Sequence, residues 1–293
     1  MLNINTNYAA SFASNAAKSS SQGLNSAMEK LSTGMRINYA KDDAAGQAIS
    51  TRLSAEVQGL QVASRNAADA QSMIDTAEGA LQETHNVLLR MRELAVQSAN
   101  GTLTDGDRAH TDAEFDQLVA EVTRIAENTT WAGKSLLDGS VDGAAAAGGN
   151  PARPALSFQV GEGANQTISV EIDNMSAGSL GTATGTTGVA LNAAGLDSAT
   201  NAQTAIISID NAIDSVSKAR GEMGAVSNRL SSTMSNLDQI AVNLSASQGR
   251  IQDADFAQET GNLAKNQILQ QAATAMIAQA NASKSSVLTL VRG

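Results

Sequence analysis

Residues 53–95 read LSAEVQGLQVASRNAADAQSMIDTAEGALQETHNVLLRMRELA, with an apolar residue at every seventh position. The rungs of this first ladder are Leu53, Leu60, Ala67, Ile74, Leu81, Leu88 and Ala95. A repeat of about 3.5 residues predicts a long helix with a narrow seam for coiled-coil packing. At about 1.5 Å per residue, a helix of roughly 50 residues would extend roughly 75 Å, which favours assembly over a compact catalytic fold.

A second ladder with the same period lies toward the other end of the chain. Its rungs are Ala202, Ile209, Val216, Met223, Leu230, Leu237, Leu244 and Ile251. Both prolines lie between the two ladders, and half of the 24 glycines fall between Gly133 and Gly195, so the turns are concentrated there. Folding at this middle region would lay the two ladders against each other. We therefore predict a mainly α fold, an antiparallel long-helix coiled-coil hairpin with a small β-hairpin in the middle of the chain.

The middle region contains the signals for that β-hairpin and for one further helix. Two alternating apolar runs, separated by Gly161 and Gly163, consist of Leu156, Phe158 and Val160, and of Ile168, Val170 and Ile172. This alternation predicts two strands with one buried face. Apolar residues at helical spacing predict a helix from about Asp107 to Asn128, capped by Thr104 or Asp105. Residues 176–196, rich in Gly, Thr, Ser and Ala, are expected to form a short flexible connection.

Composition excludes several function classes. Aromatic residues make up 2% of the chain, so a thick core is not expected and stability must come from many neighbours. The net charge of −10 predicts no nucleic-acid partner, and the lack of an 18-residue apolar run predicts no membrane insertion. There are no cysteines, and the only histidines, His85 and His110, belong to no metal-binding motif. We therefore expect no enzyme, no cofactor and no metal site.

The two chain ends are apolar and carry very little charge. Lys18 is the only charged side chain from Met1 to Met28, and the last 40 residues hold five charged side chains. Helices of this kind need cover on several faces, so we expect their apolar side chains to pack between subunits. In an isolated monomer we expect the helices themselves to fray or to be disordered. These expected packing residues are Ile4, Tyr8, Phe12, Leu24, Met28, Leu31, Phe256, Leu263, Leu269, Met276, Val287 and Leu290.

Two glycines, Gly59 and Gly79, interrupt the first ladder. Each lowers helix stability by about 1 kcal/mol relative to alanine. Either they permit close approach of a neighbouring helix or they are simply tolerated. The sequence leaves both explanations open.

Several motifs, in order along the chain, resemble those of bacterial flagellins, the filament subunits of the flagellum. They are INTN at 4–7, LSTGMRIN at 31–38, AKDDAAG at 40–46, RNAADA at 65–70, RELAVQSA at 92–99, RIQDADF at 250–256 and ILQQA at 268–272. The resemblance covers roughly residues 1–175 and 200–293, and it indicates a short form without large outer domains. It implies a structural subunit that polymerises into the filament for motility, is exported unfolded and folds on assembly.

The resemblance also implies a division of the chain. Residues 1–45 and 252–293 would form an inner terminal coiled coil with its connector, in which Asp42 or Asp43 caps the next helix. Residues 46–175 and 197–251 would form a rod-like helical domain with the β-hairpin, and 176–196 would be a remnant of the variable region. The location would be the extracellular filament, reached without a cleaved signal peptide.

The partners implied are other flagellin subunits, an export chaperone, and cap and hook-junction proteins. A vertebrate Toll-like receptor would contact Arg90, Leu94 and Glu114, although this face would also serve neighbouring subunits. Four threonines, Thr182, Thr184, Thr186 and Thr187, are candidates for O-glycosylation, and ordinary loop composition explains them equally well. The competing functions are a hook-filament junction protein, built on similar helical ends, and a secreted coiled-coil adhesin or effector.

Overall fold

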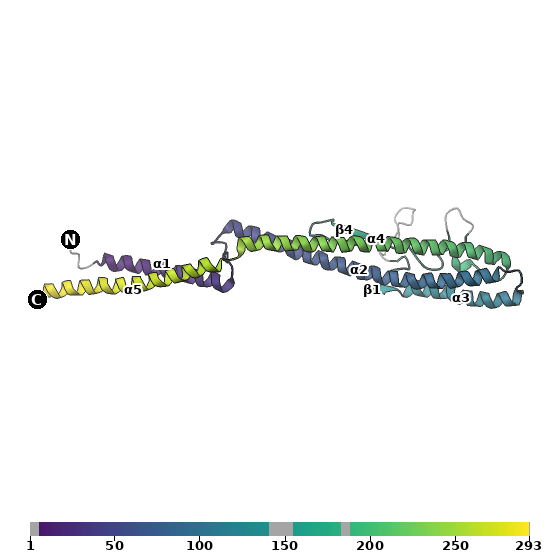
Figure 1. Ribbon diagram of the computed structural model, residues 1–293, viewed down its shortest axis with the longest axis horizontal. Helices are drawn as coiled ribbons and strands as arrows, with labels where there is room; N and C mark the ends of the chain where they lie inside the picture. Colours follow the sequence, from purple (N-terminus) through teal and green to yellow (C-terminus); the bar gives the residue numbers. More distant parts are fainter. Residues whose placement is uncertain (1–5, 141–154, 183–187, 293) are drawn as a thin grey trace. The chain divides into compact units, whose positions relative to one another are not determined.

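The computed structural model describes residues 6–140, 155–182 and 188–292, with only the backbone described for residues 155 and 287–292. Its long helices are α1 (Tyr8–Thr33), α2 (Ala44–Ser98), α3 (Asp105–Asn128), α4 (Ala199–Gln252) and α5 (Phe256–Arg292). The short elements are β1 (Thr130–Trp131), β2 (Lys134–Ser135), β3 (Ala155–Gln159), β4 (Thr167–Glu171) and the 3-10 helix η1 (Leu191–Ala193). The predicted mainly α fold with a small β-hairpin is confirmed (Figure 1).

Contacts divide the chain into two units. Residues 1–57 and 242–293 form the first, here called the terminal unit, and residues 58–241 form the second, here called the central unit. Both units therefore join segments that are far apart in the sequence. The helices α2 and α4 each contribute to both units.

The core of the central unit is built on the two ladders. The rungs from Leu60 to Ala95 on α2 and from Ala202 to Leu237 on α4 are all buried. Many intervening positions are fully buried alanines, such as Ala77 and Ala212, and their small side chains let the helices approach closely. The heptad pattern therefore predicted the core-facing stripe of both helices.

Polar pairs along this seam fix the direction of α4 relative to α2. The Ser64 hydroxyl bonds to Asp238 at 3.3 Å, and Arg92 Nε donates to Asp210 Oδ1 at 2.7 Å. Between them, Arg220 Nη2 lies 3.5 Å from Glu78 Oε1. Partners on α4 move toward its start as those on α2 move toward its end, so the two helices run antiparallel.

The predicted β-hairpin is present and packs on the core of the central unit. The strands β3 and β4 pair antiparallel, with Leu156 opposite Val170 and Phe158 opposite Ile168. Val170 and Ile168 are buried, while Leu156 and Phe158 are half-buried against the same core. The alternating pattern therefore identified the buried face of the hairpin correctly.

The hairpin also explains one of the two glycines of the first ladder. A Cβ atom added at Gly59 would lie 3.2 Å from the Cβ of Glu162, in the hairpin turn. A Cβ atom added at Gly79 would meet nothing within 4 Å. Gly59 therefore permits close approach of the hairpin turn and not of a helix as expected, whereas Gly79 is merely tolerated.

Hydrogen bonds at the helix starts identify the capping residues. Thr104 caps α3, since its side chain accepts from the Asp107 amide and the Asp107 carboxylate accepts from the Thr104 amide. At the start of α2, Asp43 Oδ1 accepts from the Gly46 amide at 2.9 Å. Asp42 instead accepts from the amides of Asn38 and Tyr39, so it closes the preceding turn.

The described parts of residues 176–196 differ from the expected flexible connection. Four apolar side chains in them are buried: Ala177, Leu180, Leu191 and Leu196. The backbone closes on itself, because the Leu191 amide donates to the Leu180 carbonyl at 3.0 Å. These apolar residues have no regular spacing, so no periodic pattern indicated that they would be buried. The expectation of a flexible connection rested on the Gly-, Thr- and Ser-rich composition alone.

Candidate interaction surfaces

The terminal unit is held together by the pairing of α1 with α5, which lie side by side in Figure 1. The Lys30 ammonium lies 3.3 Å from Glu259 Oε1, and the Asn7 amide donates to the Ala280 carbonyl at 3.3 Å. Among the side chains described, the buried positions of the two helices are all small, and they are Ala13, Ser20, Ala27, Ala273 and Ala280. The seam of this pair therefore removes little apolar surface from water.

The large apolar side chains of the same helices lie mostly outside that seam. Of the expected packing residues, Tyr8, Phe12, Met28, Phe256, Leu269 and Met276 are exposed, with Phe12 at 78% and Met276 at 63%. Leu24, Leu31 and Leu263 are half-buried. Ile4 and the side chains of Val287 and Leu290 lie outside the described residues.

Part of this apolar surface is hollowed into a groove between α1 and α5. The groove has a volume of about 460 Å³, and Phe12, Leu269 and Met276 line it together with small residues. Exposed apolar area that is concentrated in this way marks a surface for another protein. The groove has no ionisable side chain in its lining. An apolar partner surface therefore suits it best.

The junctions next to the pair are tied together by Gln252, at the end of α4. Its side-chain oxygen accepts from the Ser50 hydroxyl at 2.7 Å, and its amide nitrogen lies 2.9 Å from the Met35 sulfur. Its main-chain carbonyl accepts from the Arg36 amide at 2.7 Å. One side chain thus links α2, α4 and the connector that follows α1. Sequence reasoning missed this role, since glutamine is common throughout the chain.

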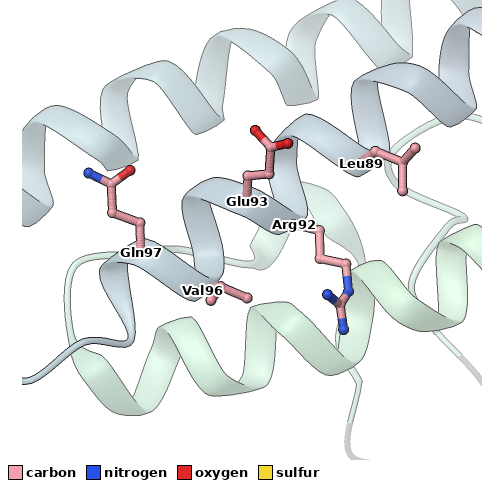
Figure 2. Close-up of a pocket in the computed structure, with 5 residues that line it drawn as sticks. All are labelled: Leu89, Arg92, Glu93, Val96 and Gln97. Atoms are coloured by element: carbon pink, nitrogen blue, oxygen red, sulfur yellow. The ribbon is translucent and has the colours of Figure 1, made fainter.

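A second exposed surface lies on α2 in the central unit. Leu89, Arg92, Glu93, Val96 and Gln97 line a shallow groove of about 520 Å³, and Figure 2 shows their side chains projecting from α2. Arg92 points toward α4, where it pairs with Asp210. Leu89 and Val96 are about half exposed. Our sequence reasoning missed this surface, although the spacing of seven between Leu89 and Val96 was a signal for it.

The three residues expected to contact a receptor differ in exposure: Arg90 and Glu114 are exposed, and Leu94 is buried. Arg90 donates from Nη2 to Glu114 Oε1 at 2.8 Å and from Nη1 to Glu93 Oε2 at 3.0 Å, and these hydrogen bonds raise the pKa of Arg90. Arg90 and Glu114 therefore form one exposed pair. Leu94 is 2% exposed and belongs to the core, although a spacing of four residues places it on nearly the same side of α2 as Arg90.

The remaining candidate residues form no chemical site among the residues described. Thr182 is exposed, while Thr184, Thr186 and Thr187 lie outside the described residues. His85 is half-buried on α2 and His110 is exposed on α3. In the ranges that the structure covers, no three acidic or histidine side chains gather as metal ligands, and no helix is long and apolar enough to cross a bilayer.

Comparisons with known proteins agree with this architecture. The chain matches the model of the bacterial flagellin N-terminal helical region over residues 4–142, and that of the C-terminal helical region over residues 206–291. It is 44% identical over 266 residues to a flagellin of Halalkalibacterium halodurans, with 91% of each chain covered. It is 40% identical over 289 residues to the flagellar filament 33 kDa core protein of Treponema phagedenis, with 99% of each chain covered.

A solved structure described as a flagellar hook-associated protein from Vibrio parahaemolyticus shares the fold. It is 18% identical, it covers 72% of this chain and 100% of its own, and the TM-score is 0.58. At 18% identity, the comparison supports a shared fold and carries no conclusion about function. The two family models and the relatives matched along nearly the whole chain decide the family, and they confirm the resemblance found in the motifs: the chain belongs to the bacterial flagellin family.

Proposed function

We propose that this flagellin completes the folding of its two ends only when sibling subunits cover them in the flagellar filament. As a bacterial flagellin, the chain is a structural subunit of that extracellular filament. The further proposal concerns how the subunit reaches its assembled form. It takes residues 1–45 and 252–293 as the inner terminal coiled coil and the segments between them as the outer rod.

The observation that supports this proposal is the distribution of side-chain size around the α1–α5 pair. The side chains that the pair buries are small, while Phe12, Leu269 and Met276 remain exposed around an open groove. Burying a large apolar side chain contributes about 1.5–3 kcal/mol, so the largest stabilisation available to these helices requires a second molecule. Another copy of the same pair is the occupant that we propose for the groove.

A weakly stabilised pair also suits export. Chain entropy opposes the ordering of helices that bury little, so the ends of a free subunit are expected to unfold easily. Such a chain can be threaded through a narrow channel without a cleaved signal peptide, and its incomplete surfaces call for an export chaperone. Cap and hook-junction proteins are the further partners proposed at the growing tip. No enzymatic role is proposed, because the described surfaces are built for packing.

Two smaller sites remain proposals. We propose that the exposed ion pair of Arg90 and Glu114 contacts a Toll-like receptor. The buried Leu94 would not touch the receptor, but it would hold α2 in place below this ion pair. Soluble monomer carrying Arg90→Ala should bind such a receptor more weakly than the parent protein. O-linked sugars are proposed for the threonines at 182–187, and intact-mass measurement of native protein would detect them.

The assembly proposal is tested with two variants and one control. Deleting residues 255–293 should leave a folded central unit that cannot form filaments. Met276→Ser replaces a large apolar side chain by a short one that ends in a hydroxyl. Because Met276 is already exposed in the monomer, the variant should leave monomer stability unchanged and still weaken polymerisation. The matched control, Gln267→Ser, exchanges one exposed polar side chain for another on the same helix.

Seeded polymerisation, followed by light scattering and electron microscopy, measures the outcome. Hydrogen exchange of monomer and filament adds a direct test of folding on assembly, since α1 and α5 should gain protection only in the filament. Normal filaments from the truncated chain, or fully protected terminal helices in the monomer, would refute the proposal. A chain that stays monomeric under seeding would instead favour the adhesin alternative.

A further inference from the structure

The turn between α2 and α3 contains the only Asn-Gly pair of the chain, Asn100-Gly101. Both residues are exposed. In such a pair, the main-chain nitrogen of the second residue can attack the side-chain amide carbon of the asparagine. Glycine favours this attack because it has no Cβ atom to obstruct the approach or to restrict the backbone. A Cβ atom at Gly101 would meet nothing within 4 Å, so the surroundings leave the turn open as well.

The hydrogen bonds of the Asn100 side chain suit the first step of this reaction. Its amide oxygen Oδ1 accepts from the Thr102 main-chain N–H at 3.2 Å. This donor would stabilise the negative charge that develops on Oδ1 when the amide carbon is attacked. Within the described part of the chain, the Gly101 N–H donates to no acceptor, so no hydrogen bond has to break before it reacts.

The hydrogen bonds of the Asn100 main-chain carbonyl suit the second step. This oxygen accepts from Arg108 Nη2 at 3.0 Å and from the Leu103 amide at 3.3 Å. The Arg108 side chain is 9% exposed, and its other nitrogens bond to the Ser98 carbonyl at 3.0 Å and to Asp105 Oδ1 at 3.3 Å. A charged donor is thus fixed against one of the two carbonyl groups that water can later attack.

We propose that Asn100-Gly101 is a self-modification site, at which the folded turn converts asparagine into isoaspartate and Arg108 directs the product. In the first step the Gly101 nitrogen bonds to the Asn100 side-chain carbon, the carbon–nitrogen bond of the amide breaks, and ammonia leaves with the Gly101 proton. The product is a five-membered succinimide ring. In the second step one water molecule adds to a ring carbonyl and reopens the ring. The sequence consumes water and releases ammonia, with no oxidation or reduction.

Which carbonyl the water attacks determines the product. Attack at the former side-chain carbon gives aspartate, and attack at the main-chain carbon gives isoaspartate, whose new carboxylate is the former Asn100 main-chain carbonyl. The main-chain carbonyl has two donors, one of them charged, whereas the side-chain carbonyl has one neutral donor. Charge-assisted hydrogen bonds are the stronger kind, so the fold favours isoaspartate. The new carboxylate would then lie beside Arg108 as an ion pair.

The test follows the modification of full-length protein at neutral pH. One sample stays native and a second is kept in guanidinium chloride, and digested peptides are analysed by chromatography with electron-transfer fragmentation, which distinguishes isoaspartate from aspartate. The native protein should modify Asn100, with an isoaspartate-to-aspartate ratio at least about threefold above that of the denatured chain. Asn128, also exposed but followed by Thr129, is the internal control and should stay unmodified.

Two variants separate the chemistry from folding. Gly101→Ala fits the open turn without strain, and it should slow the modification about tenfold, equivalent to about 1.4 kcal/mol in activation free energy. Arg108→Gln, compared by circular dichroism with the parent, should lower the native product ratio to the denatured value. A native Asn100 that stays intact while the denatured chain reacts would overturn the proposal. Equal product ratios in the two samples would overturn it as well.

Discussion

Two glycines in one helix give the sharpest prediction about stability. Gly59 and Gly79 both lie within α2 and both belong to the central unit. Replacing either by alanine restricts the unfolded chain and favours the helix, a gain of about 1 kcal/mol in the free energy of unfolding. The two sites differ in what the new methyl group would meet. Their comparison therefore isolates the contact between α2 and the hairpin.

The magnitudes follow from the surroundings of each site. At Gly79 the methyl group enters open space, so Gly79→Ala should gain the full amount of about 1 kcal/mol, or about 2–4 °C in Tm. At Gly59 it would lie 3.2 Å from the Cβ of Glu162, closer than ordinary carbon contacts, and the hairpin turn would have to move. Overpacking costs about 1–3 kcal/mol, so Gly59→Ala should be neutral or destabilising.

Urea unfolding of the monomeric full-length protein measures both changes. The fluorescence of Trp131, the only tryptophan, reports on the central unit, because Trp131 packs against the core of that unit. An unchanged m-value would show that the variants unfold the same amount of structure. Gly221→Ala is a control on the partner helix α4, where the added methyl group would also meet nothing within 4 Å.

The reasoning would fail if Gly59→Ala stabilised the protein as much as Gly79→Ala does. It would also fail if removing the Glu162 side chain did not rescue Gly59→Ala. In a double-mutant cycle, Glu162→Gly should restore most of the missing gain, because it deletes the Cβ atom that the methyl group meets. Additive effects of the two substitutions would place the cost of Gly59→Ala elsewhere.

Three further predictions concern the central unit. Leu88→Ala empties a fully buried rung and should lower the free energy of unfolding by about 2–5 kcal/mol in urea, and a loss below about 1 kcal/mol would contradict the packed seam. Thr104→Ala removes the cap of α3 and should cost about 0.5–2 kcal/mol by the same assay, with Thr104→Ser nearly neutral. Hydrogen bonds from the Thr104 hydroxyl and amide lower the pKa of Asp107 below its ordinary 3.8. The Asp107 carboxylate therefore stabilises the folded protein fully above that pH, and this stabilisation is lost as the pH falls through the lower pKa of the folded state. Asp107→Asn should therefore flatten the acid limb of stability against pH, and an unchanged limb would argue against the capping box.

Regular patterns made most of the central unit predictable. The ladders and the alternating strands repeat at a fixed period, so local rules suffice to find them. Local rules also narrowed the cap of α3 to Thr104 or Asp105, and the hydrogen bonds decide for Thr104. Features that depend on a distant partner did not follow from the sequence. Leu94 illustrates this limit. Its spacing of four residues from Arg90 indicated a shared helix face, but the spacing could not show that Leu94 is buried in the core while Arg90 is exposed.

The glycines and residues 176–196 show the same limit from the opposite side. Gly59 and Gly79 are indistinguishable in sequence, and only the position of Glu162 separates their roles. Leu180 and Leu191 lie in a segment whose composition favours a loose connection, yet both are buried. Apolar residues without a period carry no signal about which surface they will find. Tertiary contacts therefore decide these positions.

The terminal helices show why a periodic pattern predicts a helix more securely than it predicts what covers the helix. Ala13, Ser20 and Ala27 recur every seven residues on α1, as Ala273 and Ala280 do on α5, and this stripe of small residues forms the seam within the pair. The larger Tyr8 and Phe12 lie outside that stripe and are exposed. A single pair of helices cannot use both stripes at once, because two rods share one line of contact. The small stripe allows close approach at little energetic gain, and the large stripe offers more stabilisation that this pair leaves unused. A division of this kind is expected when the stronger contacts are reserved for neighbouring subunits.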